Sequence, residues 1–435
     1  MLPPTNRLPK ESTIPAVWMR SGTSKGLFLH REHLPADETK WESILLALMG
    51  SKGTQAGENA PQTDGLGGGT STTSKVAVVG RSSQPGIDLE YSFVQVDFKA
   101  GRTDRSGTCG NMVAGVGPFA WDQHLLDRSS GWSSSSSSTA VVVDGDGEEI
   151  PAMIDIRVLD TNTSQVFRLT MPNPYYYHHT HPDSLSMFAA TWEAIKVTMV
   201  QPGGQMMGAL FPKKESSSSN STEEERTTVL EIPCGWTGQL LRVRATLIDC
   251  GNPFVLVAAA DMPAQYHQEQ QDALFSDAAR LTVETLRRAA SLRLGLATSW
   301  DAAAHQRTVP KIAVVTPATA AGASVDATVT AYSLGDLHPT IQLTGAVALA
   351  AALSVPGTVL AAAAAASTIK VDNGSHTSSY APPTSRTWRI AHPRGTVKVE
   401  TVSSRLADGS YCIESASVMR TARKLFEGQA FYCLK

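Results

Sequence analysis

The sequence predicts an α+β fold built from two pseudo-symmetric lobes, each a curved β-sheet wrapped around a central helix. Three observations support this expectation. The chain has 435 residues, which is too long for one ordinary hydrophobic core. Short runs rich in Val, Ile and Phe outnumber long helical patterns. Finally, similar motifs return in the same order in the two halves of the chain.

The expected strands form an early group and a late group, each run bounded by Gly, Ser or Asp. The early runs are "AVWM", "GLFLH", "KVAVVG", "YSFVQVDF", "TAVVVD" and "MIDIRVL", and the late runs are "LLRVRATLIDC", "PFVLVAAA", "KIAVVTP", "ATVTAYSL" and "VKVETVSS". Each half of the chain can therefore supply a sheet of its own.

Helices are fewer. Apolar residues recur at steps of three and four over 271–297 and predict an amphipathic helix there. The apolar stretch 345–366 is long enough to cross a bilayer, but Pro356 and Gly357 divide it and alanine gives little apolar drive. We expect a buried helix of about ten residues followed by a turn.

An internal repeat links the two halves. "RSGTSKGLFL" (20–29) and "CGNMVAGVGPFA" (109–120) are echoed by "DCGNPFVLVA" (249–258) and "TGAVALAAAL" (344–353). In each half a Gly-containing turn leads into a strand, and later a Gly precedes a helix of very small residues. Small side chains let a helix lie close to surrounding strands. The alternative is chance similarity in a chain rich in Ala and Gly.

We expect the first lobe to comprise 10–205, completed by 413–435, and the second lobe to comprise 206–412. Two Ser-rich segments, 129–138 and 213–226, cannot bury enough apolar surface to order themselves and are expected to be solvated insertions. The second of them lies near the expected lobe boundary.

Charge and cysteine content exclude several functions. With 37 Lys+Arg against 40 Asp+Glu and a net charge of −3, the sequence gives no sign of a nucleic-acid partner or a membrane anchor. The five cysteines are odd in number and form no C-x-x-C pair, which argues against a disulfide framework and a zinc site. The N-terminus has no apolar signal region, so we expect a cytoplasmic protein.

Cys109 is the first candidate for chemistry. It precedes Gly110 and Asn111 at the expected start of the small-residue helix, where free amides and the helix dipole stabilise an anion. A thiol in that setting can act as a general base or a nucleophile. The alternative is a buried small residue without a chemical role.

Lys75 is the second candidate. It follows the hydroxyl residues of 70–74 and a Gly-rich approach that would let a ligand come close to the backbone. The stretch lacks the Gly-Lys-Ser/Thr ending of a P-loop, which disfavours nucleotide binding. A solvated lysine at a strand entrance is the alternative.

The cluster from Arg20 to Lys25 has two cations, three hydroxyls and a glycine between two strands, a set that suits a carboxylate. The alternative is a plain polar turn. His178, His179 and His181 match no standard metal spacing, so we expect a surface loop there and no metal site.

Six motifs in order resemble the PrpF family, from about residue 14 to 432. They are "IPAVWMRSGTSKGLFL", "GLGGGTSTTSKVAVV", "TCGNMVAGVGPFA", "DCGNPFVLVAAAD", "LHPTIQLTGAVALAAALSVPGT" and "VMRTARKLFEG". The family includes 2-methylaconitate and methylitaconate isomerases, 4-oxalomesaconate tautomerases and aconitate isomerases. The resemblance implies the diaminopimelate-epimerase-like fold, with the active site between the lobes.

The resemblance implies Lys75 and Cys109 as the catalytic pair, with the order of base and acid left open. It implies that substrate carboxylates are bound by Arg20, Ser21, Gly22, Thr23, Ser24, Thr72, Gly110, Asn111, Met112, His338, Thr344 and Gly345. Relatives that racemise carry a second cysteine in the second lobe. Here that position reads Leu343-Thr344-Gly345, which argues against a racemase with two thiols.

The expected activity is an allylic isomerisation of a tricarboxylate without cofactor or metal, closest to a fungal aconitate isomerase converting cis- to trans-aconitate toward itaconate. The enzyme alternatives are 2-methylaconitate isomerase and 4-oxalomesaconate tautomerase, and a non-catalytic carboxylate-binding protein is the alternative of another class. The small-molecule substrate is the expected partner, with no nucleic acid and no membrane, and a homodimer is kept open.

Overall fold

The computed structural model describes residues 11–51, 62–126, 141–143, 149–174, 176, 191–212, 226–272, 275–318, 323–360 and 382–434. The Ser-rich segments, apart from Arg226, and the histidines of 178–181 lie outside the described residues, so the expectations for them stay predictions.

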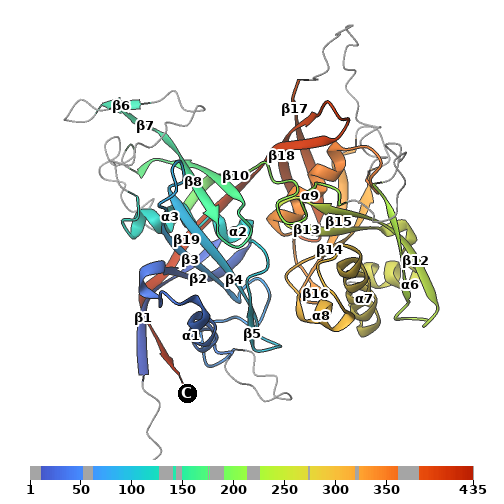
Figure 1. Cartoon of the computed structure of the whole chain (residues 1–435), viewed down its shortest axis with the longest axis horizontal. Helices are drawn as coiled ribbons and strands as arrows, with labels where there is room; N and C mark the ends of the chain where they lie inside the picture. Colours follow the sequence, from blue (N-terminus) through green and yellow to red (C-terminus); the bar gives the residue numbers. More distant parts are fainter. Residues whose placement is uncertain are drawn as a thin grey trace, which may run out of the picture.

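The described strands and helices follow one another in an α+β order (Figure 1). The first half contains β1 (Glu11–Ser21), β2 (Ser24–His30), α1 (Trp41–Met49), β3 (Lys75–Arg81), β4 (Leu89–Asp97), β5 (Arg102–Asp104), α2 (Gly110–Val113), α3 (Val116–Asp122), β6 (Val141–Val143), β7 (Glu149–Pro151), β8 (Met153–Asp160), β9 (Val166–Pro172) and β10 (Thr191–Val200). The second half contains β11 (Thr228–Pro233), β12 (Leu240–Asp249), β13 (Pro253–Ala258), α6 (Ala264–Gln271), α7 (Asp277–Arg293), α8 (Trp300–His305), β14 (Lys311–Pro317), β15 (Ala327–Ser333), β16 (Asp336–Leu337), α9 (Leu343–Ser354), β17 (Thr384–His392), β18 (Gly395–Arg405) and β19 (Tyr411–Cys433).

The two lobes repeat one strand arrangement. In the first, β2 pairs antiparallel with β1 and parallel with β3, and β3 pairs antiparallel with β4. In the second, β13 pairs antiparallel with β12 and parallel with β14, and β14 pairs antiparallel with β15. Every run expected to be a strand lies in or overlaps one of these strands or β6, β8 and β18. The internal repeat therefore reflects a repeated unit of the fold.

The C-terminal strand β19 connects the lobes. It pairs with β1 and β10 from the first half of the chain and with β18 from the second. Figure 1 shows it as a red strand running from one lobe to the other. It was expected only as a segment completing the first lobe, and the boundary at residue 205 stays a prediction.

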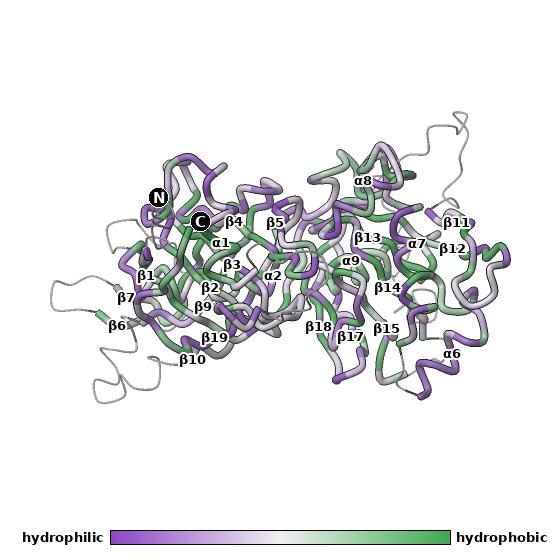
Figure 2. The backbone as a smooth tube through the Cα atoms, turned by 90° about the horizontal axis from the view of Figure 1, so that it is seen from below, coloured by the Kyte–Doolittle hydropathy of each residue, from purple (hydrophilic) through white to green (hydrophobic). Residues whose placement is uncertain are grey.

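Strands of both lobes belong to one 17-stranded sheet; in each lobe one face of this sheet lies toward a shared central core, and the other face is covered by a helix. Because side chains alternate along a strand, Ala77 and Val79 of β3 enter the central core. Val76 and Val78 lie on the opposite face and pack under α1. In the same way, Ala313 and Val315 of β14 enter the central core, whereas their neighbours pack under α7. Figure 2 shows α2 and α9 near the middle of the molecule.

The helix expected within 345–366 is α9, which is buried along eleven of its twelve residues. Two other helix expectations were wrong in extent. The 271–297 pattern is a helix only from Asp277 to Arg293, because the Ser276 hydroxyl caps its start and accepts a hydrogen bond from Ala279 N at 3.1 Å. The small-residue helix after Cys109 is two short helices, α2 and α3, of four and seven residues.

The tight packing around α9 predicts that a larger side chain there lowers the free energy of unfolding. Ala350 is 0% exposed, so leucine there would force extra atoms into a filled core. We expect Ala350→Leu to lower the free energy of unfolding by about 1–3 kcal/mol, measured by urea denaturation. Ala302→Leu on α8, where the side chain is half-buried, is the control and should cost less. A stability equal to wild type for Ala350→Leu would contradict the packing described.

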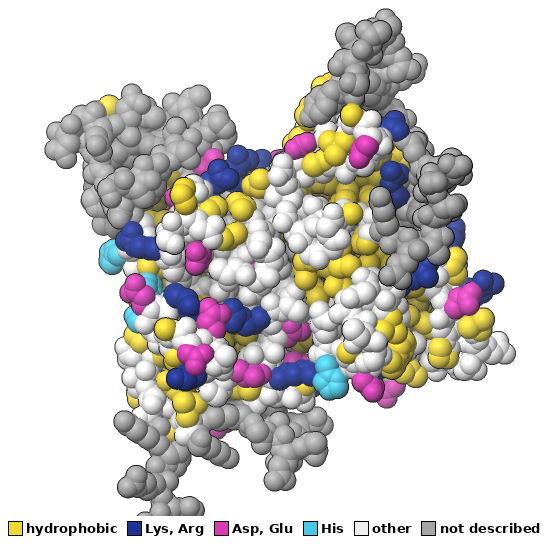
Figure 3. All heavy atoms as spheres, in the orientation of Figure 1, with side chains coloured by type: hydrophobic (Ala, Val, Ile, Leu, Met, Phe, Trp, Pro, Cys, Tyr) yellow, Lys and Arg dark blue, Asp and Glu magenta, His cyan; other side chains and the backbone are white. Residues whose placement is uncertain are grey.

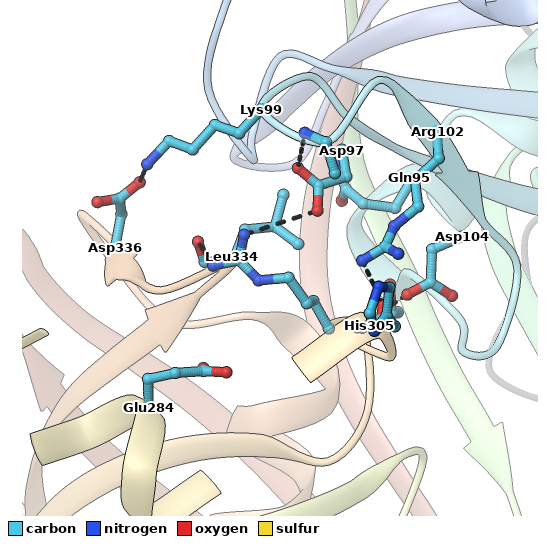
Figure 4. A network of polar contacts seen from close by, with 12 residues as sticks. Gln95, Asp97, Lys99, Arg102, Asp104, Glu284, His305, Leu334 and Asp336 are labelled. Atoms are coloured by element: carbon cyan, nitrogen blue, oxygen red, sulfur yellow. Dashed lines mark hydrogen bonds and ion pairs between the residues drawn. The ribbon is translucent and has the colours of Figure 1, made fainter. Parts of the chain in front are cut away.

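Polar contacts join the lobes beside the central core (Figure 4). Lys99 Nζ lies 2.6 Å from Asp336 Oδ2, and Arg102 Nη2 donates to the carbonyl oxygen of His305 at 2.6 Å. On the face seen in Figure 3, basic and acidic side chains are interspersed, as expected from the balanced composition. Within the described residues, no helix has the length and apolar character that crossing a membrane requires.

Candidate active site between the lobes

Lys75 begins β3 and points to the inner face of the first sheet. It shares this face with Ala77 and Val79, and it is 8% exposed. Its Nζ donates to Gln95 Oε1 at 2.5 Å and lies 4.9 Å from the centroid of the Phe93 ring. Burial lowers the pKa of Lys75, with proximity to Cys109 acting in the opposite direction. The lysine is a buried amine, which excludes the alternative of a solvated charge at the strand entrance.

The hydroxyls before Lys75 hold the loop together. Thr70 Oγ1 lies 3.1 Å from Thr72 Oγ1 and 2.7 Å from Thr73 Oγ1, and Ser74 Oγ donates to Gln62 Oε1 at 2.5 Å. The Thr72 carbonyl accepts a hydrogen bond from the Lys25 amide at 2.9 Å. These contacts fix the entrance of β3, and the described contacts of these hydroxyls are to the loop itself.

Cys109 lies at the N-cap of α2, in extended backbone conformation with φ −129° and ψ 95°, and is partly exposed. Its carbonyl accepts from Val113 N at 3.1 Å and from the Tyr91 hydroxyl at 3.3 Å. The expected start of a helix is confirmed, but α2 has only four residues, so its dipole is small. Positive charge around Cys109 comes instead from side chains.

The residue before Cys109 is clamped by both lobes. Thr108 N donates to Asn252 Oδ1 at 3.0 Å, and Asn252 Nδ2 donates to the Thr108 carbonyl at 3.1 Å and to Thr344 Oγ1 at 3.0 Å. On the other side, Thr108 Oγ1 donates to Asp160 Oδ2 at 2.6 Å. Burial raises the pKa of Asp160 to about 6. The position of Cys109 thus depends on contacts across the lobe junction.

Three basic side chains from distant parts of the chain, Lys75, Lys311 and Arg420, lie close enough to Cys109 to interact with it electrostatically. Proximity to Cys109 favours the charged forms of Lys75, Lys311 and Arg420, while burial opposes them and lowers the pKa of Lys311 to about 8 and of Arg420 to about 10. The nearby buried carboxylate of Asp160 is fully engaged with Thr108, Asn162 and Thr163. The junction is therefore a local cationic site in a chain with balanced charge.

One of these cations, Arg420, lines a cavity of about 320 Å³. Its lining comes from three parts of the chain: Gly22 and Thr23; Thr340 and Ile341; and His392, Thr396, Val397, Met419, Arg420 and Thr421. The volume is at the lower end of the range for small-molecule sites. Lys75 and Cys109 are outside this lining, and Arg420 is the residue that links the cavity to them.

Asn111 connects the Arg20–Lys25 turn to Arg420. Its Oδ1 accepts from Arg420 Nε at 2.9 Å, and its Nδ2 donates to Thr23 Oγ1 at 3.1 Å. Gly22 has φ 55°, and a Cβ there would lie 2.5 Å from Asn111 Oδ1. Only glycine therefore allows this approach of the turn to α2.

Three other residues expected to bind substrate, Arg20, Ser21 and Ser24, lie in or beside the Arg20–Lys25 turn. Ser21 Oγ donates to the Asn111 carbonyl at 2.5 Å, and Ser24 is buried beside it at the start of β2. Arg20 Nη1 donates to Thr421 Oγ1 at 2.7 Å and to the Gly22 carbonyl at 3.2 Å, behind the cavity lining. These three side chains support the turn.

The remaining expected residues are packed. Gly110 lies against Leu343, Met112 against Gly26, and Gly345 against the Phe254 ring. His338 is 4% exposed, and its Nδ1 accepts from Thr340 N at 3.2 Å. Burial, together with Lys75 and Lys311, lowers the pKa of His338 to about 4, so it is neutral at pH 7.

The chain is similar to known proteins over almost its whole length. The family model described as "PrpF protein" matches residues 11–432. The chain belongs to the PrpF family. It is 29% identical to the 2-methyl-aconitate isomerase of Shewanella oneidensis, covering 98% of each chain. It is 31% identical to the (4E)-oxalomesaconate Delta-isomerase of a Novosphingobium species, covering 96% of this chain and 97% of that one.

The fold is shared with a solved structure. The crystal structure of a methylitaconate-delta-isomerase superposes with a TM-score of 0.59 at 24% identity, covering 97% of this chain and 96% of that one. This likeness confirms the expected fold class, and the named relatives make this PrpF protein an isomerase.

Four residues of this candidate site were not predicted from the sequence. Arg420 lies within the motif "VMRTARKLFEG", but its position depends on β19 returning beside the Arg20–Lys25 turn. Asn252 lies in a second-lobe segment of the internal repeat (249–258), and Lys311 begins a run that was expected only as a strand. His392, at the end of β17, had no sequence signal.

Arg420 gives a testable expectation. Arg420→Gln should raise the KM of the PrpF isomerase about 10- to 100-fold, because a charge-assisted hydrogen bond to a substrate carboxylate is worth about 1.5–3 kcal/mol. Steady-state kinetics measure this. Arg423→Gln is the matched control, since Arg423 is exposed on the same strand. An unchanged KM for Arg420→Gln would show that the cavity beside it does not bind the substrate.

Proposed function

We propose that this PrpF-family isomerase converts cis-aconitate to trans-aconitate by cofactor-independent 1,3-proton transfer. One observation carries the proposal: Lys75 is buried on the inner face of its strand, and proximity to Cys109, from a distant part of the chain, favours its charged form. The names of the relatives support an unsaturated acid of the aconitate type as the substrate class.

The cationic site suits a polyanion. Arg420 lines the cavity. Lys75, Lys311 and Arg420 each interact electrostatically with Cys109. The charge of a tricarboxylate would be balanced by Arg420 and Lys311, while Lys75 in its amine form is left to take a proton. The same charges would stabilise the dienolate intermediate, whose negative charge spreads onto carboxylate oxygens.

The reaction can be written with Lys75 as the base and Cys109 as the acid. The Lys75 amine takes a proton from the substrate methylene, and the electron pair of that C–H bond forms the new double bond. The old double bond opens toward the far carbon, to which the Cys109 thiol gives a proton. Solvent then removes the proton from Lys75 and restores the one on Cys109. One C–H bond breaks, one forms, and nothing is oxidised or reduced.

This assignment follows from the surroundings of Lys75. Burial lowers its pKa, so a larger fraction is neutral amine at a given pH than for a lysine in water. The amine fraction rises with pH. We therefore expect kcat, measured at saturating substrate, to rise with pH toward a midpoint below the ordinary lysine value of 10.5.

Proton NMR in D₂O with cis-aconitate, 2-methylaconitate and 4-oxalomesaconate tests the proposal. We expect trans-aconitate to form from cis-aconitate, with deuterium in its new methylene group. Faster turnover of either other acid would make this chain the isomerase or tautomerase of that substrate. Neither product nor deuterium uptake with any of the three would leave a non-catalytic carboxylate-binding protein.

We propose a cytoplasmic location and a role in an itaconate-type route on narrower grounds. All five cysteines are free thiols, which suits a reducing compartment. The itaconate-type role rests on the proposed product alone.

A further inference from the structure

Lys311 occupies in the second lobe the position that Lys75 occupies in the first. Each lysine is the first residue of a strand that runs parallel to the second strand of a hairpin, β3 beside β2 and β14 beside β13. Each hairpin turns at a glycine with positive φ, 55° at Gly22 and 77° at Gly251. The repeat of the fold therefore relates the two lysines.

The alternation of side chains directs both lysines toward the same core. Lys311 lies on the face of β14 that carries Ala313 and Val315 into the central core, as Lys75 shares its face with Ala77 and Val79. The opposite face of β14 packs under α7. The alternation thus places both lysines on faces that point toward the central core.

The segments that lead to Lys311 and Cys109 lie side by side. Thr308 N donates to Asp104 Oδ2 at 2.9 Å. A Cβ on Gly107 would lie 3.0 Å from Thr308 Cγ2 and 3.1 Å from Val309 Cγ1. The strand start that carries Lys311 is therefore packed directly against the chain that carries Cys109.

Lys311 is a partly exposed cation that makes neither a hydrogen bond nor an ion pair with any residue in the described ranges. The charged and titratable groups that act on it are Lys75, Cys109 and Asp104, and it acts on His338. The Asp104 carboxylate is already used, by Thr308 N and by the backbone and hydroxyl of Ser106. A cation near another cation and without a direct counter-ion among the described residues is suited to bind an anion.

We propose that Lys311 binds a carboxylate of the substrate opposite Lys75, so that the substrate bridges the two lobes. This inference rests on the proposed function and deepens it. With Arg420 it assigns cations of both halves of the chain to one tricarboxylate. Because Lys311 belongs to the second lobe, it also accounts for a site at the junction that is incomplete in either lobe alone.

The test uses propane-1,2,3-tricarboxylate, a saturated analogue that has no double bond to move. Binding to the wild type, Lys311→Met and Lys311→Arg is measured by isothermal titration calorimetry between pH 7 and 9. Lys398→Met is the control, because Lys398 is exposed on β18. We expect Lys311→Met to weaken affinity about 10- to 100-fold at pH 7, Lys311→Arg to stay within about fivefold, and the control to be unchanged.

The pH dependence separates carboxylate binding from a structural role. In the wild type, affinity should fall as pH rises through about 8, because Lys311 loses the proton that binds the anion. Lys311→Arg should lose this part of the decline, since arginine stays charged, and any decline that remains belongs to Lys75. Affinity within twofold of wild type for Lys311→Met, with the same pH dependence, would overturn the proposal.

A second measurement needs no variant. Reductive methylation of the wild type, followed by peptide mass spectrometry, should label Lys311 less when propane-1,2,3-tricarboxylate is present, and Lys398 equally in both samples. Equal labelling of Lys311 would also overturn the proposal. Failure of the proposed function is distinguishable, because it appears as absent isomerisation by the wild type whatever the result of either binding test.

Discussion

Lys75→Met should lower kcat for isomerisation about 10²- to 10⁴-fold, the range that general base catalysis usually contributes. Methionine keeps an apolar stem beside the Phe93 ring and removes the amine that takes the proton. The rate is followed by proton NMR of substrate and product. The fold should persist, because Gln95 can keep its hydrogen bond to the Ser74 carbonyl, 2.9 Å away.

Lys398→Met is the control for this substitution as well, and its kcat should equal that of the wild type. The pH profile supplies an independent check, since the rise of kcat with pH should disappear with the amine. A Lys75→Met enzyme that keeps more than about a tenth of wild-type kcat would exclude Lys75 as the base.

Cys109→Ala should also abolish product formation, with a loss of about 10²- to 10⁴-fold in kcat, because the far carbon no longer receives its proton. Cys412→Ser is the control, since Cys412 is likewise a partly exposed free thiol. The stability of Cys109→Ala should stay near that of the wild type, because the contacts that position this residue are made by its backbone and by Thr108.

Deuterium exchange separates the two roles. In Cys109→Ala, Lys75 can still remove the methylene proton and return a deuteron from D₂O, so cis-aconitate should become labelled without isomerising. Lys75→Met should show neither labelling nor isomerisation. The reverse pattern, with labelling only in Lys75→Met, would assign the base to Cys109.

Much of the fold could be predicted from local sequence. The strands are short Val- and Ile-rich runs, and α9 has alanines that only a tightly enclosed helix would use. The helix after Cys109 could not be delimited in this way, because its small residues specify close packing and not a helix length. For 271–297, the apolar pattern was right but the cap at Ser276 set the true start.

The residues of the candidate site also differ in whether local sequence could predict them. Lys75 and Cys109 stood out because each follows an unusual local stretch, and the structure places both at the lobe junction. The hydroxyls of 70–74 bond to one another and to Gln62 in the structure, and the expected role of Thr72 in substrate binding stays a prediction. Arg420 and Lys311 could not be assigned, because their positions depend on long-range strand pairing that periodicity does not encode.

The central claim is that Lys75 and Cys109 act on opposite ends of one three-carbon unit. A crystal structure with propane-1,2,3-tricarboxylate tests it most directly. The account predicts Lys75 Nζ and Cys109 Sγ within about 3.5–4 Å of the two terminal carbons of that unit, with Arg420 on a carboxylate. A ligand that contacts only one of the two groups, or that binds outside the junction, would contradict it.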